Sequence, residues 1–129
     1  LTGFLVSAVD YLDALRLRKE ILAEFIRDVF SKVDVLHVPV VPIPVPTLAE
    51  SNIQNNPGFI EYLSLLGHCT RPFDYLGLPA FALPAGLTDN GMPTGFQLTA
   101  PPFEESVLFR AGRAYERETK WSFSELIFQ

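Results

Sequence analysis

Few side chains in this sequence are of types that carry out catalysis, and they are dispersed along the chain. His68 and Cys69 are the most suggestive pair, because an imidazole base can activate a cysteine nucleophile. They are chain neighbours, however, so a Cys–His couple between them is geometrically awkward and a reactive thiol needs a base from elsewhere. The alternative for Cys69 is the role of a half-buried small residue. The sequence also lacks the Gly-x-Ser-x-Gly motif of a nucleophile elbow.

Metal and peptide-recognition chemistry have little material in this chain. His37 lies within an apolar run, where a core or edge histidine is more common than a ligand. With two histidines and one cysteine, the sequence predicts no zinc site and no cofactor. The stretch Pro39-Val40-Val41-Pro42 formally matches a PxxP ligand but lacks flanking basic residues. We therefore expect a loop that crosses the edge of a sheet.

The most specific stretch runs from Thr70 to Pro79, with the sequence Thr-Arg-Pro-Phe-Asp-Tyr-Leu-Gly-Leu-Pro. It combines a hydroxyl, two opposite charges and rigid turn residues immediately before a predicted buried strand. Loops at the ends of strands are common places for binding sites. A turn held by a local bond of Asp74 is the alternative, and these residues alone leave both interpretations open.

Composition narrows the classes of protein further. The chain has 129 residues, enough for one domain, and a net charge of −5 without the basic runs that bind nucleic acid. A single cysteine excludes an internal disulfide and favours a reducing, cytoplasmic location. No apolar stretch approaches the roughly 20 residues of a membrane span. The chain begins Leu1-Thr2-Gly3, and we expect it to be cut from a longer protein.

The elements that must position these residues begin with a long helix. Ser7 is predicted as its N-cap, with Asp10 reaching back in a capping-box arrangement. Helical spacing of apolar residues predicts that the helix runs to about Phe30, with a buried face formed by Ala8, Leu12, Leu15, Leu22, Ile26 and Val29. A buried strand is predicted at 33–38, and the prolines after it require an extended chain.

The second half of the chain alternates between helix and strand signals. A short helix is predicted at 59–66, and strands at 79–86 and 94–100 are joined by the turn Asp89-Asn90-Gly91. A last helix is expected at 103–119, with an inner face formed by Val107, Leu108, Ala111 and Tyr115. The predicted fold class is α/β, with a mixed β-sheet flanked by helices.

Several blocks of this sequence, in order, resemble the amidase signature family. Thr70 to Ala80 is similar to the family's Thr-x-Pro-x-Asn-x-x-Gly-Leu-Pro-Ala pattern, with Asp74 in place of the usual Asn. Further similar blocks cover the helix from Ser7, Asp34-Val35-Leu36, Phe81 to Gly86, Gly91 to Leu98, and Leu108 to Glu116 followed by Trp121. Val38-Pro39-Val40 replaces the commoner Thr-Pro-Thr. The resemblance implies that residues 1–129 are the C-terminal part of a single amidase signature domain.

The same resemblance implies what is missing. The family hydrolyses amides with a Ser–Ser–Lys triad that lies in its N-terminal half, on a Gly-rich stretch with the lysine upstream. This sequence contains no Ser-Ser pair and no Gly-rich loop, and its lysines match no catalytic position of the family (Lys19, Lys32 and Lys120). No catalytic residue is therefore predicted in this chain, and the missing half of the protein is its expected partner.

What the resemblance does carry over is the lining of a substrate pocket. It implies that Thr70 and Phe73 border the channel for a small-molecule amide substrate, with Gly67, Arg71 and Asp74 as further candidates. In the catalytic subunits of glutamyl-tRNA amidotransferases, which look similar, an acidic residue stands where this sequence has Gly67. Three functions remain open: the C-terminal part of an amidase, the same part of such an amidotransferase, and a non-catalytic interaction domain. Association with further copies of the chain is also expected.

Overall fold

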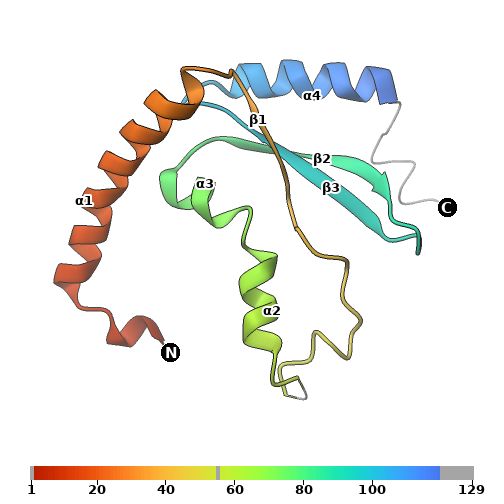
Figure 1. Ribbon diagram of the computed structural model, residues 1–129, viewed down its shortest axis with the longest axis horizontal. Helices are drawn as coiled ribbons and strands as arrows, with labels where there is room; N and C mark the ends of the chain where they lie inside the picture. The colour runs from red at the N-terminus through yellow and green to blue at the C-terminus, as the bar shows by residue number, and fades with distance from the viewer. Residues whose placement is uncertain (1, 55, 120–129) are drawn as a thin grey trace.

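The computed structural model describes residues 2–54 and 56–119 (Figure 1). A short 3-10 helix at Thr2–Leu5 precedes the long helix α1 (Ala8–Phe25), which continues as a π-helical turn at Ile26–Phe30. Strand β1 (Leu36–Pro39), helices α2 (Phe59–Leu66) and α3 (Arg71–Leu76), strands β2 (Ala80–Leu87) and β3 (Pro93–Thr99) and helix α4 (Glu105–Thr119) follow. The class is α/β, as predicted, and Lys120 and Trp121 lie outside the described residues.

The sheet of the described chain is antiparallel rather than mixed. Its strand order is β1-β3-β2, so β3 is central and pairs with both neighbours in antiparallel register. The turn at Asp89–Gly91 joins β2 to β3, as predicted, and a short hairpin connection can only give an antiparallel pair. β1 is shorter than predicted, because residues 33–35 precede the first ladder pair, Leu36 with Thr99.

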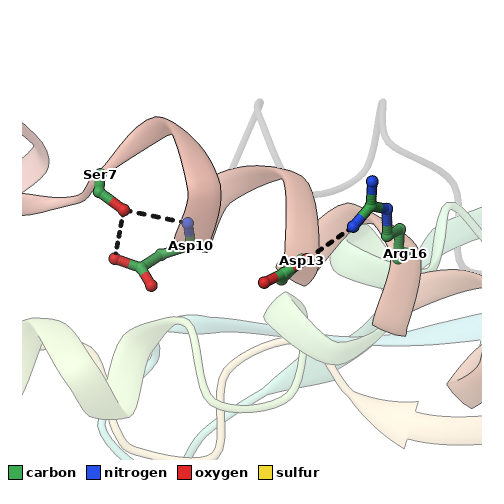
Figure 2. Close-up of polar contacts among 4 residues, drawn as sticks. All are labelled: Ser7, Asp10, Asp13 and Arg16. Carbon is green, nitrogen blue, oxygen red and sulfur yellow. Dashed lines mark hydrogen bonds and ion pairs between the residues drawn. The ribbon is translucent and has the colours of Figure 1, made fainter.

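Helix α1 begins where its capping signal predicts. The backbone N–H of Asp10 donates to Ser7 Oγ at 3.1 Å, and the Ser7 hydroxyl donates to Asp10 Oδ2 at 2.7 Å (Figure 2). The carboxylate thus binds the hydroxyl rather than the backbone N–H expected in a capping box. Arg16 Nη1 and Asp13 Oδ1, 3.0 Å apart, form an ion pair further along the exposed surface (Figure 2).

The predicted buried face of this helix is only half correct. Leu22 and Phe25 pack against the core, but Leu12 and Leu15 are 52% and 41% exposed. The reason is the short reach of α3, which meets α1 where the Tyr75 hydroxyl donates to the Ala14 carbonyl at 2.6 Å. No described residue continues the cover toward the N-terminus of α1, where the apolar pattern persists.

Two apolar cores lie on opposite faces of the sheet (Figure 1). On one face, α4 packs on β2 and β3, with Leu108 only 2% exposed, and its inner face agrees with the prediction. On the other face, α1 and α3 cover the sheet. Side chains alternate between the faces along a strand, so Phe96 and Leu98 point to α4 while Gln97 and Thr99 point to α3.

Candidate functional site

The turn at residues 67–70 joins α2 to α3 and contains the first predicted site residues. Gly67 ends α2, and its carbonyl accepts hydrogen bonds from the backbone N–H of Thr70 at 3.3 Å and of Arg71 at 3.0 Å. The Thr70 hydroxyl donates to the same carbonyl at 3.4 Å. These contacts bring Gly67, Thr70 and Arg71 together into one tight unit, which we call the 67–70 turn.

Arg71 folds back over this turn. Its Nη2 donates to the Leu63 carbonyl at 3.1 Å, in the last turn of α2, where a cation is favoured by the helix dipole. A Cβ added at Gly67 would lie 2.7 Å from Arg71 Nε. The guanidinium therefore occupies the space in which any side chain at position 67 would start, and it places a positive charge there.

Helix α3 follows directly, where the sequence alone favoured a loop or a turn. Pro72 suits its first turn, because a proline lacks the N–H that would be unpaired there. Gly77, at φ +71°, ends the helix in the left-handed conformation, and the N–H of Leu78 donates to the Phe73 carbonyl at 3.0 Å. The Thr70–Pro79 motif is thus a capped helix of about one and a half turns, set in front of β2.

The five predicted pocket residues divide into two groups. Thr70 and Gly67 are half-buried in the 67–70 turn, and Arg71 and Asp74 are exposed at the start of α3. Phe73 is 9% exposed and points into the core, with its ring centroid 6.4 Å from that of Phe25. In the described chain, Phe73 therefore supports the 67–70 turn from below and does not line an open surface.

Gln97 is the residue that the sequence did not single out. It lies on β3, is 4% exposed, and its Nε2 donates to the Cys69 carbonyl at 2.9 Å and to the Pro39 carbonyl at 3.3 Å. An amide nitrogen has two N–H donors, so both are used, and the amide oxygen could not face these two carbonyls. The only sequence signal was its place in the Gly-x-Gln-Leu block, because its partners lie 28 and 58 positions away.

The side chains with catalytic potential are not gathered near this turn. His68 is exposed and Cys69 is a half-buried free thiol. His37 lies on β1, with its ring 4.5 Å from that of Phe96, on the α4 face of the sheet. Lys19 and Lys32 are exposed. The structure thus supplies no paired nucleophile and base within residues 2–54 and 56–119.

The described part of the chain offers little for other kinds of site. It holds no cluster of three or more metal-binding side chains, and none of its helices is long and apolar enough to cross a membrane. A shallow surface groove of about 470 Å³ runs along α4, lined by Phe109, Arg110, Arg113, Ala114 and Arg117. It lies on the side of the sheet opposite α3 (Figure 1). The carboxylates with a lowered pKa, Asp28 beside Arg27 and Glu50 beside Thr47, are on exposed surfaces elsewhere.

Comparison with known proteins places this arrangement. The chain is 34% identical over 123 residues to a glutamyl-tRNA(Gln) amidotransferase protein of Chloroflexus aggregans, its A-type subunit, covering 92% of this chain and 24% of that protein. It is 33% identical over 120 residues to an amidase of Pseudomonas putida, covering 92% of this chain and 25% of the relative. The chain therefore spans about a quarter of the length of the curated relatives it matches.

The fold is shared with a solved structure as well. The chain superimposes on 6-aminohexanoate cyclic dimer hydrolase with a TM-score of 0.78 and 23% sequence identity, over 91% of this chain and 26% of that one. The amidase family profile matches residues 2–109, which include every element from the first helical turn to the start of α4. The chain belongs to the amidase family.

Proposed function

We propose that this chain is the C-terminal, substrate-facing part of an amidase that hydrolyses a carboxylic amide to an acid and ammonia or an amine. In that reaction, water adds across the C–N bond: the carbonyl carbon gains the hydroxyl and the leaving nitrogen gains the proton. Family membership over residues 2–109 supports the reaction type. The observation that carries the substrate-facing role is the 67–70 turn, in which three of the predicted pocket residues are held together at the surface.

The role proposed for the chain is binding rather than bond cleavage. The sequence has no Ser-Ser pair, and no histidine, cysteine or lysine of the described residues is paired with a second catalytic group. A nucleophile would have to come from another part of an amidase domain. The exposed apolar residues at the start of α1 and on α2 support such a partner, because they continue the predicted core patterns without cover (Val9, Leu12, Leu15, Ile60 and Leu63).

A second candidate is the corresponding part of a glutamyl-tRNA amidotransferase, and relatives of that name at 33–37% identity favour it. The space at Gly67 argues for the first candidate. An acidic residue there would hold the ammonium of a glutamine, whereas here the Arg71 guanidinium fills that space and repels a cation. We therefore favour a neutral amide, aromatic or aliphatic, as the substrate.

Two preparations test the proposal: residues 1–129 alone and the full-length product of the gene that encodes them. We expect benzamide-like or aliphatic amides to be hydrolysed by the full-length product, while the 129-residue chain stays at the rate of the buffer blank. A serine-directed inhibitor should abolish the turnover. Turnover by the isolated chain that this inhibitor removes would contradict the binding-only role, and a full-length product inactive on every amide would contradict the proposed reaction.

A further inference from the structure

We propose that Gln97 is a positioning residue for amide binding: its side chain fixes the 67–70 turn against the end of β1 and so sets the shape of the pocket. This proposal rests on the proposed function, because it assigns the 67–70 turn to the substrate. Gln97 contacts no reacting atom, and it acts through the backbone that it holds.

The geometry of the contact identifies this role. Gln97 joins three segments that are distant in sequence: the centre of β3, the end of β1 at Pro39 and the turn at Cys69. Cys69 directly precedes Thr70, the N-cap of α3, so the tethered carbonyl is one peptide away from the candidate pocket hydroxyl. Because both donors of one rigid amide are used, the two carbonyls are held at a fixed separation.

The tether is separate from the packing that stabilises the fold. The apolar clusters on the two faces of the sheet comprise other residues, among them Phe73, Leu76, Leu83 and Leu108. A change at Gln97 that keeps its volume leaves these contacts in place. What it removes is the connection between the sheet and the 67–70 turn, which no other described side chain of β3 contacts through a hydrogen bond.

Thr99 is the matched control, two positions further along the same face of β3. It is fully buried, and its hydroxyl donates to the Pro79 carbonyl at 2.8 Å, beyond the C-terminus of α3. Each side chain therefore makes a buried hydrogen bond from the same strand to a backbone carbonyl. Only the bond of Gln97 ends in the 67–70 turn, so the two positions separate a general loss of stability from a change in the pocket.

The test uses the full-length gene product that contains this chain, as the variants Gln97→Glu, Gln97→Met and Thr99→Val. Glutamate keeps the shape but replaces both donors by a carboxylate, and methionine keeps the length without charge. We expect KM for benzamide and hexanamide to rise about tenfold in both Gln97 variants with kcat within about threefold, as for lost binding interactions. Hydrogen exchange of the Thr70 and Arg71 amides should accelerate in these variants. Thr99→Val should lower Tm while leaving KM within about twofold.

Three results would decide against the proposal or its basis. Gln97 variants that lower Tm as Thr99→Val does, with wild-type KM and unchanged exchange at Thr70 and Arg71, overturn the positioning role. Should Gln97→Glu fail to fold, the uncharged Gln97→Met gives the same comparison. A wild-type protein that hydrolyses no amide overturns the proposed function instead, and the exchange rates then still report whether Gln97 tethers the turn.

Discussion

Gly77 offers a quantitative check on how the Thr70–Pro79 motif is built. It ends α3 at φ +71°, a conformation that costs an L-residue about 1–2 kcal/mol. A Cβ added there would also lie 2.2 Å from Nη2 of Arg18, on the neighbouring helix α1. Replacing Gly77 by alanine therefore introduces two separate penalties, one from the backbone and one from the contact with Arg18.

Gly91 separates these two penalties. It lies in the β2–β3 turn at φ +79°, and a Cβ added there would meet nothing within 4 Å. Gly91→Ala thus carries the backbone penalty alone. We expect about 1–2 kcal/mol of destabilisation for Gly91→Ala and up to about 1 kcal/mol more for Gly77→Ala, because the end of the arginine can move aside at modest cost.

Urea unfolding followed by far-UV circular dichroism measures both variants, each in the wild-type and the Arg18→Ala background. The excess cost of Gly77→Ala should vanish in the Arg18→Ala background, whereas the cost of Gly91→Ala should not change, because the two sites are independent. A Gly77→Ala protein as stable as wild type would refute the left-handed cap. An excess that persists without the arginine would refute the contact with Arg18.

Three further predictions follow from other parts of the molecule. The isolated chain should bind a hydrophobic dye and self-associate at low micromolar concentration, since Leu12 and Leu15 are exposed; a monodisperse monomer in light scattering without dye binding would contradict this. The full-length gene product should show a lower kcat/KM for glutamine than for benzamide, because Arg71 occupies the space at Gly67; the reverse order would favour the amidotransferase candidate. Glu50 accepts bonds from the Thr47 N–H and hydroxyl, both at 2.8 Å, which lower its pKa, so this turn should be intact at neutral pH and loosen only as the pH falls through that lowered value. The shift of the Thr47 amide signal with pH checks this, and a midpoint at or above the ordinary glutamate pKa would contradict it.

Local signals in the sequence were reliable guides to the elements. The capping serine Ser7, the Asp89–Gly91 turn, the helix at Phe59–Leu66 and the inner face of α4 are all observed as predicted. Each depends on residues within a few positions of one another, so propensity and hydrogen bonding within the segment decide it. The Thr70–Pro79 stretch reads as a loop or turn in the sequence, because proline and glycine punctuate it, yet both suit the ends of a short helix.

The sequence by itself therefore determined the α/β class, the order of most elements, the family and the absence of a Ser–Ser pair in this chain. Only the tertiary structure decided which of the helical apolar faces are covered, that Phe73 points into the core, and that Arg71 lies over Gly67. It also decided the role of Gln97, whose two partners are 28 and 58 residues away. The physical reason is that burial and long-range hydrogen bonds depend on which segments meet in space, and a side chain's own neighbours in the sequence do not specify that.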